Sequence, residues 1–365
     1  MKTKLFLTML VAFGALLSSC SKDEDPAPLT KEQATVEIAD LKATYDSEST
    51  AMENNEGMKV FENLSSLNLP FVMPDVNITP VSKRISSFYP RMEQAKNGDF
   101  SAIKKSIIAR SEFVFSEYVG TWEYNKQTQD WDYTSTPTDK VVIKFPYPSD
   151  NATNNAVYTI SKFTFSSGLE GSGGDYIANI TVNGSEVWYI SFSGAFSESA
   201  ISYTEKIVYT SITTPKVSYE YNQSFSMKSS GSPDDGGAMT IKTAQSWKKN
   251  GEILLSGEYN ISAKSTQTAY EVVAKANLRI ANIKFVFEVS YSANANGGSG
   301  TMTQNIKMGV YTLDGAKVGD IKYEPVDGVV VAMFYYVNGD KVPAAELFGE
   351  VFGEWDSMFG DIIDF

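Results

Sequence analysis

Alternation of apolar and polar residues over most of the chain is the feature that most limits its fold. Between Tyr118 and Val337, Thr, Ser, Tyr, Val, Ile and Phe dominate, and apolar and polar side chains alternate with a period of two residues. From Val217 to Met227 the odd positions are largely apolar and the even positions are polar. A strand of this kind has one buried and one solvated face, which is typical of antiparallel sheets. The pattern predicts a mainly β protein with about fifteen strands.

Short turn sequences indicate how these strands connect. Four dipeptides interrupt the alternating runs: Asn183-Gly184, Asn250-Gly251, Asp314-Gly315 and Asn338-Gly339. Asn-Gly and Asp-Gly favour the positive φ angles of tight hairpin turns. At Ala281-Asn282 the apolar positions change from even to odd, as a hairpin pairing Ile280 with Ile283 would require; a β-bulge is the alternative. Residues 118–338 are therefore expected to form a long antiparallel meander, either an open or closed barrel, a curved sheet or a sandwich.

The segment before this β domain, residues 30–117, has a helical and irregular character. Thr30 and Gln33 have the spacing of a capping box, so a helix is expected to start there. Four residues then share one helical face: Ala34, Ile38, Leu41 and Tyr45. A second short helix is expected over 58–67, with Phe61 and Leu64 facing inward. Prolines favour an extended chain over 71–81, and a further helix is expected over 100–115.

The end of the chain, residues 343–365, combines bulky apolar residues with acidic ones. The apolar set recurs at helical spacing: Leu347, Phe348, Val351, Phe352, Trp355, Met358, Phe359, Ile362 and Ile363. Pro343 suits the first turn of such a helix. Because this stripe must leave water, the segment is expected to be an amphipathic helix packed on the β domain.

The beginning of the chain has the features of an export signal. Lys2 and Lys4 precede an apolar run over residues 5–17, which is too short to span a bilayer. Residues 1–19 are therefore expected to be a signal peptide. The sequence Leu17-Ser18-Ser19-Cys20 resembles the lipobox of bacterial lipoproteins. The resemblance implies that Cys20 carries a lipid anchor in the membrane and that residues 20–29 form a tether; the alternative is an ordinary secretory signal followed by a chance cysteine.

An acidic cluster follows this cysteine: Ser21, Lys22, Asp23, Glu24 and Asp25. It resembles the export signal of surface lipoproteins of the Bacteroidetes group. This resemblance implies a position on the outer face of the outer membrane, exposed on the cell. The alternative is a solvated acidic linker, since charged linkers repel themselves and extend. Neither resemblance extends into the folded part of the chain.

Composition removes several classes of function. The chain has no His and one Cys, which excludes Ser-His and Cys-His catalysis and thiolate metal sites. A net charge of −13 argues against nucleic acid as a partner. Carboxylates are abundant, but no pair is distinguished by its surroundings, so we predict no catalytic residues, no metal and no cofactor. The protein is therefore predicted not to be an enzyme, and a carboxylate-dependent hydrolase is the distant alternative.

Aromatic residues crowd the first strands of the β domain. Trp122, Trp131 and Tyr133 are the candidate ligand-binding residues, because exposed Trp and Tyr stack on sugar rings; their structural role would be cross-strand packing. The prediction is a non-catalytic binding module for a glycan, a lipid or a protein. The alternative is a structural or envelope-assembly lipoprotein. A coplanar aromatic row would favour glycan binding, and an apolar pocket of several hundred Å³ beneath the helices would favour a lipid.

Overall fold

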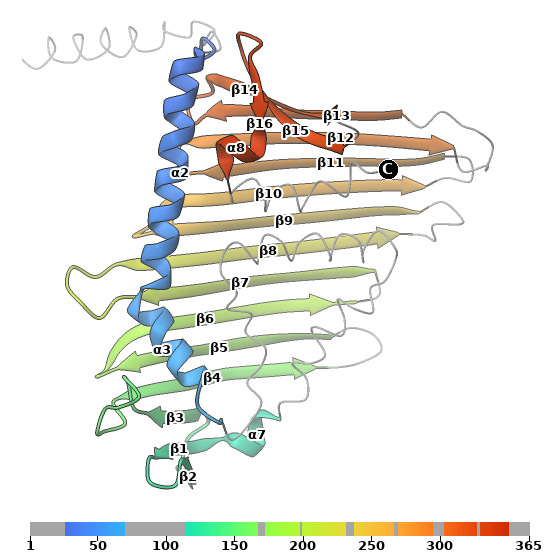
Figure 1. Cartoon of the computed structure of the whole chain (residues 1–365). Helices are drawn as coiled ribbons and strands as arrows, with labels where there is room; N and C mark the ends of the chain where they lie inside the picture. Colours follow the sequence, from blue (N-terminus) through green and yellow to red (C-terminus); the bar gives the residue numbers. More distant parts are fainter. Residues whose placement is uncertain are drawn as a thin grey trace, which may run out of the picture.

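A single sheet of sixteen strands forms the body of the protein (Figure 1). The structure is a computed structural model that describes residues 26–69, 114–166, 172–197, 199–230, 237–265, 269–294, 303–326 and 329–349. The expected signal peptide, Cys20 and the acidic cluster lie outside these residues. The same holds for the extended segment 71–81, residues 100–113 of the predicted third helix, and residues 350–365.

The strands are long and follow one another closely. The first eight are β1 (Gly120–Asn125), β2 (Asp130–Thr134), β3 (Val141–Phe145), β4 (Ala156–Ser166), β5 (Ser172–Val182), β6 (Ser185–Phe196), β7 (Ala200–Thr210) and β8 (Ser218–Ser230). The others are β9 (Ala238–Lys249), β10 (Glu252–Ser265), β11 (Ala269–Ile280), β12 (Ile283–Asn294), β13 (Thr303–Thr312), β14 (Lys317–Val326), β15 (Val329–Tyr336) and β16 (Lys341–Pro343). Fifteen of them lie between Tyr118 and Val337, which confirms the predicted number.

The strand order confirms a meander and identifies it as an open sheet. From β3 to β16 every strand pairs antiparallel with the next one in sequence. The first hairpin departs from this rule, because β1 pairs in parallel with β3 and β2 lies outside it at the edge. The sheet is therefore mixed, and its two edges, β2 and β16, are far apart. Both edge strands are short, and β16 ends in a proline, which limits edge-to-edge pairing with other chains.

The predicted hairpins are present and divide into two kinds. Asn183-Gly184 and Asn250-Gly251 have positive φ at both residues, as the tight two-residue turn requires. At residues 315 and 339 only the glycine has positive φ, and the connections are longer. Ala281 also has positive φ, and Ile280 pairs directly with Ile283, so the change of parity comes from a hairpin.

One long helix and one short helix cover one face of the sheet near the hairpin ends of the strands (Figure 1). The long helix, α2 (Lys31–Glu53), begins with the predicted capping box between Thr30 and Gln33 and buries Ala34, Ile38 and Leu41. The short helix, α3 (Glu56–Ser65), buries Phe61 and Leu64, also as predicted. Both predicted N-terminal helices are thus confirmed in position and in buried face.

Together α2 and α3 cross the strands in the reverse of their sequence order. The Leu29 amide donates to the carbonyl of Lys317 at the start of β14. Glu48 pairs with Lys249 of β9, 2.7 Å away. Asn63 donates to the carbonyl of Pro146, just after β3. Each contact lies further toward the β1–β2 end of the sheet, so the two helices hold the hairpins in a row.

At the other end, the last strands and residues 344–348 pack over the helix-covered face (Figure 1). Strand β14 pairs with β13 only near residues 309–311 and then continues with β15. The described part of the expected C-terminal helix is α8 (Ala344–Phe348), which ends at Gly349 with φ 56°. The Phe348 ring lies 5.4 Å from Phe285 and 5.6 Å from Phe334, centroid to centroid. The predicted packing of this helix on the sheet is confirmed over these residues.

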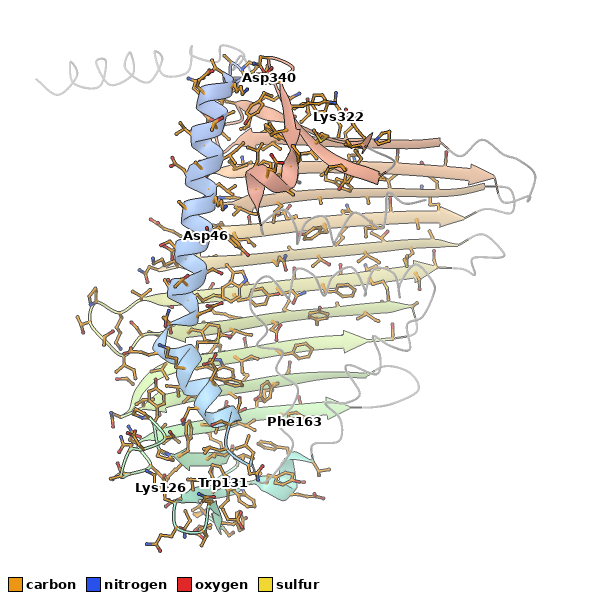
Figure 2. All side chains as sticks on the ribbon, viewed as in Figure 1. Asp46, Lys126, Trp131, Phe163, Lys322 and Asp340 are labelled. Carbon is orange, nitrogen blue, oxygen red and sulfur yellow. The ribbon has the colours of Figure 1, made fainter. Side chains whose placement is uncertain are left out.

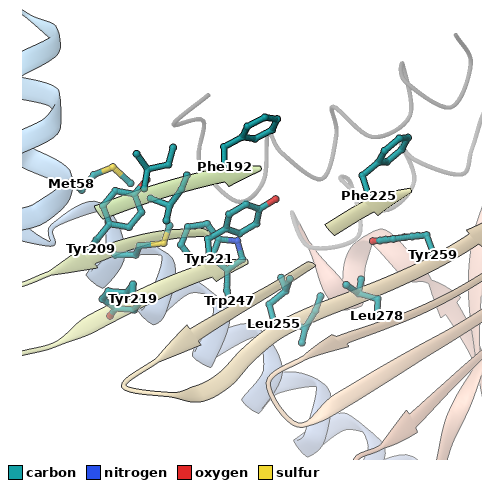
Figure 3. Packing of buried hydrophobic residues seen from close by; sticks show 14 of the residues in the cluster. Met58, Phe192, Tyr209, Tyr219, Tyr221, Phe225, Trp247, Leu255, Tyr259 and Leu278 are labelled. Carbon is teal, nitrogen blue, oxygen red and sulfur yellow. The ribbon is translucent and has the colours of Figure 1, made fainter. Parts of the chain in front are cut away.

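The core lies on this same face of the sheet, as expected from the alternation. In β8 the residues Tyr219, Tyr221, Phe225 and Met227 are buried, each two or four positions from the next. Aromatic side chains from neighbouring strands fill this layer (Figure 3). On β8 the alternate residues on the opposite face, Glu220, Asn222, Ser224, Ser226 and Lys228, are polar and half-buried or exposed. A short helix, α7 (Phe115–Tyr118), precedes β1.

Candidate functional site

The three predicted aromatic residues lie together on the first hairpin, on the helix-covered face. Trp122 of β1 is directly opposite Tyr133 of β2, with ring centroids 4.7 Å apart. Trp131 is opposite Tyr124, at 5.2 Å. Trp131 stands near the β1–β2 end of the molecule (Figure 2). The sequence therefore correctly grouped these side chains.

Their geometry is that of packed cross-strand pairs. The Trp122–Tyr133 rings are tilted by 46° and the Tyr124–Trp131 rings by 64°, so they form no coplanar row. Trp131 is only 8% exposed, and its indole N–H donates to the Asn68 carbonyl. Tyr133 is 48% exposed, but its hydroxyl donates to the Val119 carbonyl. The polar groups that would orient a sugar are engaged within the protein.

The space beneath α2 is small. A cavity of about 50 Å³ separates the helix from strands β8 to β10, lined by Tyr45, Met52, Tyr219, Trp247 and Leu255 among others. Ligand pockets are typically about 300–1,000 Å³. This cavity is therefore well below the size that a lipid chain needs. Burial raises the pKa of the Tyr219 phenol to about 12, and its hydrogen bond to Glu48 acts in the same direction.

The polar face of the sheet carries the larger hollows, which form one shallow trough. Two adjoining depressions, of about 770 Å³ and 590 Å³, cross strands β4 to β11. Both are lined by Ser193, Thr204, Ser224, Ala244 and Glu258. We call these five residues and their immediate neighbours on this face the polar trough. Sequence reasoning did not single out any of them.

Strand register explains why this part of the face is hollow. Ser193 pairs with Thr204, Thr204 with Ser224, and Ser224 with Ala244. Four short side chains therefore lie side by side across β6, β7, β8 and β9. The neighbouring rows add further short residues: Ser191, Ala195, Ser202, Ser226, Ser246 and Ser256. The trough floor thus consists of short, mostly hydroxyl side chains, surrounded by longer charged ones.

Ion pairs hold the rim at the side nearer the hairpins. Glu220 accepts from Lys206 at 2.7 Å and from Lys248 at 3.4 Å. The hydrogen bond from Lys206 is the main reason that the pKa of Glu220 falls to about 2; burial opposes it, and the Asn222 amide assists. At the β4–β5 side, Lys162 pairs with Asp175 at 2.7 Å and lowers the pKa of that carboxyl.

The polar face has more cations than acids. Over β4 to β13 its cations are Lys162, Lys206, Lys228, Lys242, Lys248, Lys264, Lys275, Arg279, Lys284 and Lys307, and its acids are Asp175, Glu186, Glu220, Glu258, Glu271 and Glu288. The whole chain carries −13. Lys242 lines the trough, is exposed, and makes no ion pair among the described residues. This face is thus locally basic on an acidic protein.

Chemically, the polar trough offers hydroxyl, amide, ammonium and carboxylate groups in an open, solvated surface. Within the described ranges, no group of three or more His, Cys, Asp or Glu residues is placed to hold a metal ion. No helix in those ranges is long and apolar enough to cross a membrane. These groups can bind a hydrophilic ligand through hydrogen bonds and charge.

No protein-family model, curated protein or solved structure matches this chain. The class is therefore defined by architecture alone: an open meander sheet with helices on one face and a hollowed polar surface on the other.

Proposed function

We propose that the protein is a lipid-anchored outer-membrane lipoprotein, exposed on the cell surface, that binds a ligand without catalysis. The polar trough carries this proposal, because its two depressions of about 770 Å³ and 590 Å³ fall in the size range of ligand sites. Its lining of short hydroxyl residues suits a hydrophilic ligand.

The placement of the tether supports this proposal. Leu29, the last residue of the predicted tether, donates a hydrogen bond to β14, near one end of the sheet. Neighbouring strands are about 4.8 Å apart, so the trough begins about 15 Å from β14 and extends to about 50 Å. A lipid on Cys20 would therefore anchor the protein through the β14 end of the sheet. The trough would stand clear of the attachment point and accessible to a ligand.

Anchoring and exposure are tested in intact cells that produce the full-length chain. We expect protease added outside the cells to digest the protein, and Cys20→Ser to release it from the membrane fraction. Ser21→Ala alone should leave both properties unchanged, because the acidic residues remain. A chain that stays undigested while a known surface lipoprotein is cleaved would overturn surface exposure. Retention of the Cys20→Ser variant in the membrane would overturn the lipid anchor.

Binding is tested with the full-length chain purified in detergent, on a glycan array and by native mass spectrometry with candidate ligands. Ser224→Tyr fills the trough without changing charge, and Thr134→Tyr makes the same change on the exposed edge strand β2. We expect Ser224→Tyr alone to abolish binding.

A structural or envelope-assembly role is the second candidate. The cavity of only about 50 Å³ beneath α2 favours it, because among the described residues this space between helix and sheet is too small for a drug-sized ligand. Ligand binding that both tyrosine variants leave unchanged, or no ligand at all, would favour this second role over a binding function in the trough.

A further inference from the structure

We infer that the polar trough binds an acidic polysaccharide, laid across the strands with its carboxylates toward the lysines of the rim. The inference rests on the proposed binding function and names the chemical class of its ligand. Three observations carry it: the local excess of cations, the hollow of ligand size, and the hydroxyl and amide groups on the trough floor.

The excess of cations points to an anionic ligand. Lys206 and Lys248 share the single carboxylate of Glu220, so this cluster keeps one positive charge. On the opposite side of the floor, Lys242 is exposed and has no ion-pair partner in the described part of the chain. An acidic chain between these two sides meets positive charge on both. With Glu258 also in the trough, the three lysines and two glutamates named here keep a net charge of +1. Such steering persists although the whole protein is negative, because salt screens charges beyond about 8–10 Å.

The floor suits a long hydroxyl-rich chain. Ser193, Thr204 and Ser224 come from three successive strands in direct register. A polymer running across the sheet therefore meets similar hydrogen-bonding groups about every 4.8 Å. Asn260 and Asn277 extend the lining onto β10 and β11 with amide donors and acceptors.

Other polymers fit less well. Neutral sugars and single-stranded nucleic acids are held largely by stacking on aromatic rings. The aromatic residues beside the trough floor, Tyr203, Phe225 and Tyr259, occupy the alternate positions that face the core. Tyr189 of β6 lies on the polar face, two residues from Ser191. A bilayer is met best by a convex or flat surface with apolar residues that insert. The trough is hollow, and its floor is built mainly from serine and threonine.

The test uses the full-length chain in detergent with two probes of the same backbone. Polygalacturonate carries a carboxylate on each ring, and its carboxyl-reduced form is neutral. We expect the reduced form to bind at least tenfold more weakly, and binding of the acidic form to weaken when salt rises from 50 to 200 mM. Equal affinity for the two forms would overturn the inference.

Variants locate the site. Lys242→Ser should weaken polygalacturonate binding about two- to fivefold, the effect of one exposed ionic contact. Lys140→Ser removes an exposed lysine before β3 and should change nothing. Ser224→Tyr should weaken binding at least tenfold, while Thr134→Tyr should not. Circular dichroism and urea midpoints verify that each variant is folded. If Ser224→Tyr does not fold, Lys242→Ser still tests the site.

The outcomes separate this inference from the proposed function. If Ser224→Tyr abolishes binding of a neutral glycan or a protein while polygalacturonate never binds, the trough is a binding site and the acidic-polysaccharide inference fails. If polygalacturonate binds but neither Lys242→Ser nor Ser224→Tyr weakens it, the trough is not its site and the inference fails. Binding to phosphatidylglycerol vesicles that polygalacturonate does not displace would assign the basic face to membranes and overturn the inference.

Discussion

Glu220 connects the stability of the sheet to the rim of the polar trough, and its replacement by Gln gives a quantitative prediction. Its carboxylate accepts from Lys206 and Lys248 on the two flanking strands, β7 and β9. Glutamine keeps the shape of the side chain and an oxygen that can accept from Asn222. The substitution therefore removes the charge and leaves the packing almost unchanged.

The pKa of Glu220 sets the magnitude. The value is about 2 in the folded protein, compared with 4.5 for the free side chain. At about 1.4 kcal/mol per unit, the difference corresponds to an upper limit of about 3 kcal/mol. Lys206 is 43% exposed in this pair, so solvent screening reduces the expected contribution to about 1 kcal/mol. A lowered folded pKa means that the stabilisation is complete above about pH 4.5 and is lost as the pH falls toward 2.

Urea unfolding of the full-length chain, followed by circular dichroism from pH 7 to pH 2, tests this reasoning. We expect Glu220→Gln to be less stable than the native chain by about 1 kcal/mol at pH 7 and equally stable near pH 2. Glu258→Gln is the matched control, since this exposed carboxylate makes no ion pair in the described residues. A stability difference that stays constant over the whole pH range would refute the assigned role of the Lys206–Glu220–Lys248 cluster.

Three further substitutions test the packing that holds the sheet. Gly57→Ala would place a Cβ against the carbonyl of Val187. We therefore expect the free energy of unfolding in urea to fall by about 1–3 kcal/mol, although alanine favours helices. A gain in stability would contradict the close approach of α3 to β6. Trp131→Phe removes the donor to Asn68 and should cost about 1–2 kcal/mol, seen as a lower melting temperature; an unchanged one would show that the bond adds nothing. Phe348→Ala should cost about 3–5 kcal/mol, and an unchanged urea midpoint would contradict the packing of α8 on the sheet.

The local elements of this fold are largely predictable from sequence, because local signals specify them. Alternation gives each strand its buried face, and the Asn-Gly turns at 183–184 and 250–251 provide the backbone angles that tight hairpins need. The capping box at Thr30 fixes the start of α2 in the same way. Each of these signals lies within a few residues, so it acts before any distant contact forms.

Features that depend on distant contacts were not predictable. The parallel pairing of β1 with β3 places β2 at the edge, and no turn sequence specifies it. The choice of an open sheet over a barrel or a sandwich depends on whether the first and last strands meet. The path of α2 across the strand ends is likewise set by single side-chain contacts such as Glu48 with Lys249.

The polar trough shows the same limit for function. Each contributing strand carries short residues at alternate positions, as in Ser191, Ser193 and Ala195, which along one strand indicate only a solvated face. Their significance arises when register aligns them with Thr204 and Ser224 on the next strands, because a row of short side chains makes a hollow. The aromatic residues gave the stronger sequence signal, yet their polar groups are bonded within the protein. On a single-layer sheet with one face used for the core, a ligand surface is therefore better sought among the short residues of the other face.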